Sequence, residues 1–116
     1  NPLAMRAGIE TLRIMEEDRL LAHAAEIGAR LRGSLERELA GVRGVVEIRG
    51  QGLMLGIELD RPCGDLLKQA CEARLLISVT AERVVRLLPP LIMSAAEADQ
   101  VVAILVPLIK KFLATP

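Results

Sequence analysis

Two segments at the start of the chain carry apolar residues at every third or fourth position, which is the spacing of an amphipathic helix. In the first, Met5, Ile9 and Leu12 follow Asn1, a candidate N-cap, and Pro2, which suits the first helical position. This pattern predicts a helix from Pro2 to Glu17. After a break at Asp18, a second helix is predicted to end near Gly41, with an apolar stripe of Leu20, Ala24, Ile27, Leu31 and Leu35.

The spacing then changes to that of strands. Residues 44–50 ("GVVEIRG") and 52–60 ("GLMLGIELD") are short, aliphatic and bounded by glycines. The connection "RGQG" predicts that they form an antiparallel hairpin with a tight glycine turn. Two more strands are predicted at residues 75–79 ("LLISV") and 83–89 ("RVVRLLP"), linked by the turn-prone "TAE".

A short third helix is predicted between the two pairs of strands. Asp65 is its candidate cap, and Leu66, Leu67, Ala70 and Cys71 are expected to face inward. Ser94 and Glu97 then form a capping-box pattern for the last helix, which is expected to kink at Pro107 because proline cannot donate a backbone hydrogen bond. The order α-α-β-β-α-β-β-α predicts an α+β fold, a small, mostly antiparallel sheet of three or four strands covered by helices. The length of 116 residues fits a single domain.

Composition excludes several classes of function. Fifteen basic residues balance fifteen acidic ones, and the chain has a single aromatic residue, Phe112, so a nucleic-acid binder is not expected. The start of the chain lacks a signal-peptide pattern and charges interrupt every apolar stretch, so a cytoplasmic protein is expected. Cys63 and Cys71 are predicted to be reduced thiols, and a metal site is not expected because His23 is the only histidine.

The candidate motifs give no complete catalytic site. Gly50, Gly52 and Gly56 resemble a dinucleotide fingerprint, but the third glycine is one position late and a strand follows, so a tight hairpin is the better interpretation. His23 is predicted to lie on the surface, and Glu58 and Asp60 are expected to be solvated. The three lysines, Lys68, Lys110 and Lys111, are all on predicted helices.

Arg86 is the one residue that poses a chemical question. It lies among the apolar residues of "RVVRLLPPL", on the same face of the strand as Val84 and Leu88, and Pro89 and Pro90 stiffen the chain after it. Its planar guanidinium suits a carboxylate. From the residues alone, an edge arginine or a structural ion pair is favoured over an anion-binding site.

Four motifs also occur in an order that resembles a known enzyme family. "NPLA" before a long helix, then "RGQGLMLGIEL", "LLISV" and "VVRLLPPL" together resemble the C-terminal part of class III aminotransferases, the fold type I enzymes that use pyridoxal phosphate. Acetylornithine aminotransferases are nearest in pattern, followed by ornithine and succinylornithine aminotransferases. The resemblance covers essentially the whole chain.

The resemblance implies that residues 1–116 are the C-terminal small domain, with residues 1–17 as the helix that leads into it. The large domain, which would bind pyridoxal 5'-phosphate through its lysine, is then expected to be absent, and the chain alone is expected to be inactive. Arg86 matches the family's arginine that grips the α-carboxylate of the amino-acid or 2-oxoacid substrate. Arg49, Gly50, Gly52 and Gly56 match the family's hairpin and are interpreted as structural.

Two hypotheses for function follow. The first is that the chain belongs to a homodimeric, pyridoxal-phosphate-dependent enzyme, N-acetylornithine:2-oxoglutarate aminotransferase of arginine biosynthesis. The alternative is a stand-alone module that binds small carboxylates through Arg86, or an assembly module without catalysis. In either case Arg86 is expected to be exposed at a strand end without a buried partner, and the apolar first helix is expected to drive self-association of the isolated chain.

Overall fold

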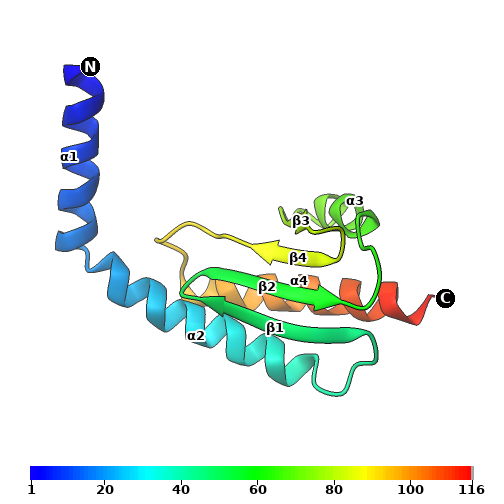
Figure 1. Cartoon of the computed structure of the whole chain (residues 1–116). Coiled ribbons are helices and arrows are strands. Elements are labelled where there is room, and N and C mark those ends of the chain that lie inside the picture. Colours follow the sequence, from blue (N-terminus) through cyan, green and yellow to red (C-terminus); the bar gives the residue numbers. More distant parts are fainter. Residues whose placement is uncertain (116) are drawn as a thin grey trace.

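The computed structural model describes residues 1–115 and confirms the predicted α+β fold. The elements follow in the predicted order: α1 (Pro2–Glu17), α2 (Leu20–Glu38), β1 (Val45–Gln51), β2 (Met54–Leu59), α3 (Asp65–Glu72), β3 (Ser78–Thr80), β4 (Val84–Leu87) and α4 (Ala95–Ala114). The helices α2, α3 and α4 pack with the sheet, whereas α1 extends away from it (Figure 1).

The four strands form one antiparallel sheet in the order β1-β2-β4-β3. The hairpin of β1 and β2 pairs Gln51 with Met54, and Gly52 in its turn has a φ of 54°, which favours glycine. Strand β4 pairs with β3, its neighbour in sequence, on one side and with β2 on the other. The two inner strands of the sheet are therefore β2 and β4. Both halves of the chain therefore contribute to one continuous surface.

The core lies between one face of the sheet and the helices. Alternate residues of β2, Leu55, Ile57 and Leu59, are buried against them, as are Val85 and Leu87 of β4. No helix lies in front of the opposite face in Figure 1. The positions between them, such as Gly56 and Glu58 of β2 and Arg86 of β4, lie on the opposite, open face.

Helix α2 approaches the β1–β2 turn closely at Gly28. A Cβ atom placed on Gly28 would lie 2.1 Å from the carbonyl oxygen of Gly52, far inside van der Waals contact. On the same helix, a Cβ on Gly33 would meet no atom within 4 Å. Only a residue without a side chain allows this contact between helix and turn.

The long helices begin where the sequence predicts. Asn1 caps α1 by accepting from the backbone N–H of Leu3 at 3.0 Å, and α4 has the predicted capping box of Ser94 and Glu97. α4 continues through Pro107, which is exposed, so proline does not end the helix. The kink at Pro107 stays a prediction.

Three details of the other helices differ from the prediction. In α3 only Leu66 and Ala70 are buried, whereas Leu67 and Cys71 are exposed. The N-cap of α3 is Gly64 and makes no side-chain capping bond, so Asp65 is the first residue of the helix and not its cap. His23 is half-buried rather than fully on the surface, because its Nε2 lies 2.8 Å from the carbonyl oxygen of Met93.

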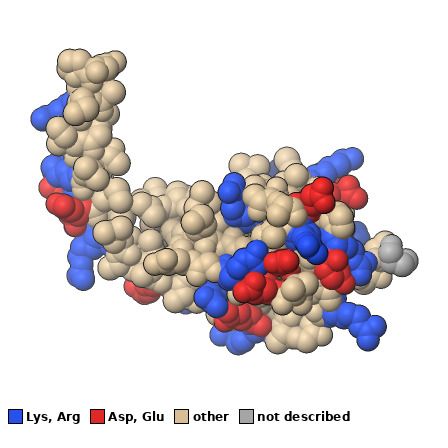
Figure 2. Space-filling view, viewed as in Figure 1, with Lys and Arg blue, Asp and Glu red and all other residues tan. Residues whose placement is uncertain are grey.

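α1 makes the molecule longer than a compact domain. The radius of gyration is 16.1 Å, where a compact chain of this length has roughly 13 Å. None of the residues of α1 is buried, including Leu3, Met5, Ile9 and Leu12. In the view of Figure 2, the charged side chains of α1 lie along one side of the helix, and uncharged residues form the rest of the surface that is seen.

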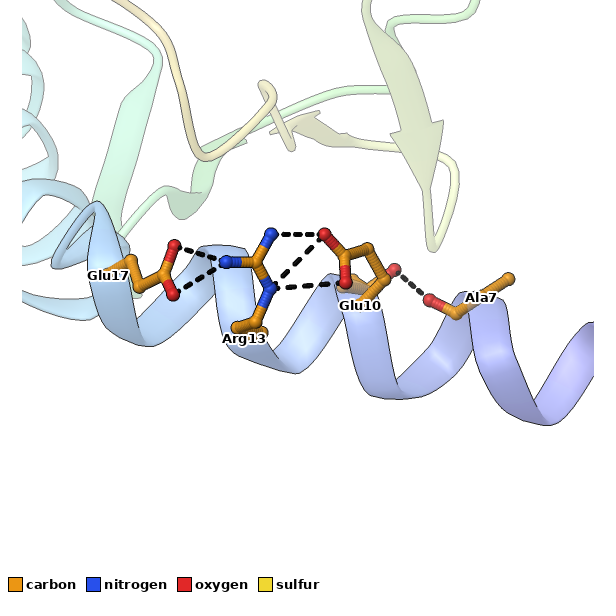
Figure 3. A network of polar contacts seen from close by, with 5 residues as sticks. Ala7, Glu10, Arg13 and Glu17 are labelled. Atoms are coloured by element: carbon orange, nitrogen blue, oxygen red, sulfur yellow. Dashed lines mark hydrogen bonds and ion pairs between the residues drawn. The ribbon is translucent and has the colours of Figure 1, made fainter.

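An ion-pair network stabilises that charged side. Arg13 donates to Glu10 one turn before it, and to Glu17 one turn after it at 2.7 Å, while the Thr11 hydroxyl donates to the Ala7 carbonyl (Figure 3). The Glu10 carboxylate raises the pKa of the Arg13 guanidinium, and Glu17 adds to this effect. Opposite charges at this spacing support an isolated helix, so α1 retains some helical support without tertiary packing.

Candidate functional site

A row of four residues crosses the open face of the sheet, one from each strand. Arg49 of β1 pairs with Gly56 of β2, Gly56 pairs with Arg86 of β4, and Arg86 pairs with Ser78 of β3. Neighbouring strands lie about 4.8 Å apart, so the backbones of the two arginines are separated by roughly 10 Å across the glycine. Two cations therefore share one face of the sheet.

Arg49 is paired with two carboxylates through one of its terminal amino groups. It donates to Glu47 on its own strand at 2.7 Å and to Glu58 on β2 at 2.6 Å. Glu58 and Glu47 raise the pKa of the Arg49 guanidinium, and Arg83 adds a further cation 3.9 Å from Glu58. Glu47 and Glu58 face each other across the strands, so Arg49 also relieves the repulsion between them. These contacts support the interpretation of Arg49 as structural.

Arg86 has a different environment. It is exposed, as predicted, and no carboxylate of residues 1–115 lies within ion-pair distance of it. Its Nε donates to the hydroxyl of Ser78 at 3.1 Å. The two terminal amino groups are left without a partner among the described residues, so they are available to an anion.

The two arginines border a shallow hollow of about 500 Å³. Its lining residues are Arg49, Gly50, Gln51, Met54, Leu55, Gly56, Thr80, Val84 and Arg86. A Cβ on Gly56 would lie 3.2 Å from Cγ1 of Val84 and would stand between the two arginines. Gly56 thus keeps the floor of the hollow clear, in addition to its place in the strand.

The remaining candidates do not join Arg86. Asp60 is bonded to Arg61 at 2.8 Å, and His23 lies on α2 beside the loop after β4. Cys63 is buried, which raises the pKa of its thiol, and its Sγ lies 3.6 Å from the carbonyl oxygen of Glu82. Within residues 1–115 no group of histidine, cysteine and acidic side chains is arranged to hold a metal ion, and no helix is long and apolar enough to span a membrane.

Ser78 was missed in the sequence because it lies on a short edge strand. The signal was present, since a hairpin that turns at residues 81–83 pairs Thr80 with Val84 and therefore Ser78 with Arg86. Ala81 and Glu82 in this turn have φ values of 47° and 64°. Alanine and glutamate rarely adopt positive φ, so the sequence did not indicate this turn or the register of β3 and β4.

Comparison with known families identifies the family of the chain. The family model of class-III aminotransferases matches residues 1–109. The chain belongs to the class-III aminotransferase family. Acetylornithine aminotransferase 1 of Bordetella bronchiseptica is 65% identical over 113 residues, and acetylornithine aminotransferase of Nitrosomonas europaea is 48% identical over 113 residues. Each of these alignments covers 97% of this chain and 29% of the relative.

Solved structures of this family have the same fold. Ornithine delta-aminotransferase of Plasmodium falciparum superposes with a TM-score of 0.93 at 28% identity, covering 100% of this chain and 31% of that one. Acetylornithine aminotransferase of Elizabethkingia anophelis superposes with a TM-score of 0.88 at 26% identity, covering 97% and 29%. The chain therefore spans less than a third of the length of the family members that it matches.

Membership of the class-III aminotransferase family implies the use of pyridoxal phosphate, and the lining of the hollow at Arg86 contains no lysine that could hold it. Lys68 lies on α3 and Lys110 and Lys111 on α4, all exposed, and none of the three lines the hollow at Arg86. A lysine that forms a Schiff base must lie beside the substrate. Residues 1–115 thus contain a candidate anion site without a lysine that could hold the cofactor there.

Proposed function

We propose that the chain is part of a pyridoxal-phosphate-dependent aminotransferase that acts on N-acetylornithine and 2-oxoglutarate, and that Arg86 binds a substrate carboxylate. The observation that carries the proposal is the unpaired guanidinium of Arg86 over an open hollow, in a chain that is 65% identical to an acetylornithine aminotransferase. The family shares the reaction type, and the identity favours this donor over ornithine.

The role of Arg86 in such a reaction is orientation. A guanidinium binds a carboxylate through two parallel hydrogen bonds, which fixes both the position and the plane of the substrate. The cofactor, when bound, supplies the electron sink for the reaction, and its ligands belong to residues outside this chain. Arg86 holds the carbon next to the carboxylate at a constant place.

This role applies most directly to the 2-oxoacid. In 2-oxoglutarate the carboxylate is adjacent to the carbonyl carbon that receives the amino group. In N-acetylornithine the α-amino group is acylated, so the free amine is at the other end of the molecule from the α-carboxylate. We therefore expect Arg86 to be needed more in the half-reaction of 2-oxoglutarate and glutamate than in that of N-acetylornithine.

The place of the chain in the larger enzyme is part of the same proposal. Residues 1–116 form its C-terminal small domain, and α1 is the helix that connects it to a large domain that binds the cofactor. The exposed apolar surface of α1 supports this, because it is more than one isolated helix can leave bare without cost. The enzyme is a cytoplasmic homodimer of arginine biosynthesis, in keeping with the two free thiols.

The test compares variants of the full-length enzyme. Arg86→Ala is expected to lower kcat/KM for 2-oxoglutarate by about 100-fold or more, because two charge-assisted hydrogen bonds are lost. Arg86→Lys should recover part of this loss, since lysine keeps the charge but not the fork. Arg32→Ala is the matched control, an exposed arginine of α2 that pairs with Glu36. Unchanged kinetics of Arg86→Ala would reject the role of Arg86.

The alternative is a stand-alone module that binds small carboxylates without catalysis. It is favoured by one observation, that the hollow and the free guanidinium both lie within this chain. Calorimetry of the isolated chain with 2-oxoglutarate distinguishes the two functions. Tight binding that disappears in Arg86→Ala favours the module, whereas negligible binding and no transamination with added pyridoxal phosphate favour the domain of a larger enzyme.

A further inference from the structure

Arg86 is held on one side and free on the other. On β3, Ser78 lies directly opposite it in the register, and on β2 the opposite residue is Gly56. Both neighbours are small, so the guanidinium is not covered by a side chain from either adjacent strand. The only hydrogen bond of its side chain to residues 1–115 is the one from Nε to Ser78.

The Ser78 hydroxyl is itself oriented by the backbone. It lies 3.4 Å from the carbonyl oxygen of Arg86, to which it donates, and 3.1 Å from Nε, from which it accepts. A hydroxyl has one proton, so donation to the carbonyl directs a lone pair to Nε. The serine is half-buried on the edge strand, where the ladder to β4 fixes its position.

This arrangement determines how an anion can approach Arg86. A carboxylate can bind a guanidinium either along Nε and one amino group, or end-on across the two terminal amino groups. The bond to Ser78 occupies Nε and leaves the end-on approach, from the side of the hollow that Gly56 keeps clear. It also restricts a long side chain that otherwise has many rotamers.

We propose that Ser78 is a positioning residue for substrate binding, because its hydroxyl holds Nε of Arg86 and thereby presents the two terminal amino groups as an end-on fork for the carboxylate next to the reacting carbon. This inference rests on the proposed function of Arg86 and adds a second residue to it. Ser78 does not touch the substrate and acts only through Arg86.

The experiment uses the full-length holoenzyme and two amino acceptors. One is 2-oxoglutarate, and the other is succinic semialdehyde, the same chain without the carboxylate beside the carbonyl. Ser78→Ala should raise the KM for 2-oxoglutarate about fivefold to tenfold with kcat within twofold, which is the effect of one lost hydrogen bond. The KM for succinic semialdehyde should stay within twofold of that of the unsubstituted enzyme.

Three controls separate positioning from a general structural effect. Ser78→Thr keeps the hydroxyl on a strand that tolerates β-branched residues, so it should restore the KM for 2-oxoglutarate. Ser34→Ala removes a serine–arginine hydrogen bond of the same length, 3.1 Å to Arg37 on α2, and should change neither KM. Calorimetry of 2-oxoglutarate binding to the holoenzyme should show the same fivefold to tenfold loss in Ser78→Ala without any turnover.

The outcomes distinguish the two proposals. In one outcome, Arg86→Ala has a weaker interaction with 2-oxoglutarate but not with succinic semialdehyde, and Ser78→Ala has the same KM values as the unsubstituted enzyme. The positioning role is then wrong and the proposed function stands. If Arg86→Ala binds 2-oxoglutarate normally, both are wrong. The positioning role would also be overturned if Ser78→Ala raised the KM for both acceptors equally, or if Ser78→Thr did not restore the KM for 2-oxoglutarate.

Discussion

The contact between α2 and the β1–β2 turn gives the sharpest prediction about stability. Gly28→Ala would place a methyl group 2.1 Å from the carbonyl oxygen of Gly52, 2.4 Å from its carbon and 2.9 Å from its Cα. All three atoms belong to the backbone of a tight turn, so no flexible side chain can move aside. Helix and hairpin must separate by more than about 1 Å to restore ordinary contact.

The expected cost follows from this overlap. Alanine is better than glycine within a helix by about 1 kcal/mol, but overpacking of a close-packed site costs about 1–3 kcal/mol, and the upper end of this range, about 3 kcal/mol, applies here because the overlap is with backbone atoms. We therefore expect a net loss of about 2 kcal/mol in the free energy of unfolding, or a melting temperature lower by roughly 8 °C for a chain of this size.

Gly33→Ala is the matched control on the same helix. Its Cβ meets nothing within 4 Å, so only the helix propensity acts and the variant should be more stable by up to about 1 kcal/mol. The assay is urea unfolding followed by circular dichroism at 222 nm, because the chain has no tryptophan or tyrosine to report by fluorescence. The reasoning is refuted if Gly28→Ala is as stable as the unsubstituted chain, or if both variants shift in the same direction.

Three further predictions concern the helices. Ser94→Ala should lower the free energy of unfolding by about 1 kcal/mol in urea, because the hydroxyl that accepts from the Glu97 N–H at 3.2 Å is lost. The backbone N–H and hydroxyl of Ser94 lower the pKa of Glu97 from 4.5, so its contribution is present above pH 4.5 and is lost as the pH falls through the folded-state pKa. The stability difference between the unsubstituted chain and Glu97→Gln should therefore be seen at pH 7 and shrink below pH 4.5; a constant difference would contradict it. Finally, light scattering should show self-association of the isolated chain. Leu12→Glu should reduce it and Arg6→Glu should not, because Leu12 is 63% exposed on the apolar side of α1 and Arg6 lies on the charged side. A monomer at high concentration would count against this.

The starts of α1 and α4 could be predicted from the sequence because local chemistry determines them, whereas α2 has no side-chain cap and ends at Glu38 rather than near Gly41. Asn1 with Pro2, and Ser94 with Glu97, make capping contacts within three residues of themselves, so no knowledge of the tertiary structure is needed. The same holds for the β1–β2 hairpin, where glycines mark a turn that joins strands adjacent in sequence. Fold class followed from the order of such elements.

The buried face of α3 shows where local pattern is insufficient. Leu66 with Ala70 and Leu67 with Cys71 form two stripes at the same spacing, about 100° apart around the helix. Contact with the rest of the core, which includes α4, decides that Leu66 and Ala70 are buried and that Leu67 and Cys71 face solvent. His23 is a similar case, because its partner, the Met93 carbonyl, is 70 residues away in sequence.

The functional difference between Arg49 and Arg86 arises from the register of the sheet. Both are arginines within strands, on the same face, and both pair with Gly56. Glu47 of β1 and Glu58 of β2 face each other in the row next to that of Arg49 and Gly56, and Arg49 donates to both, which relieves their mutual repulsion. Arg86 has no such pair of carboxylates beside it, and its other cross-strand neighbour is a serine. The sheet thus neutralises one cation and leaves the other available, although the two look alike in sequence.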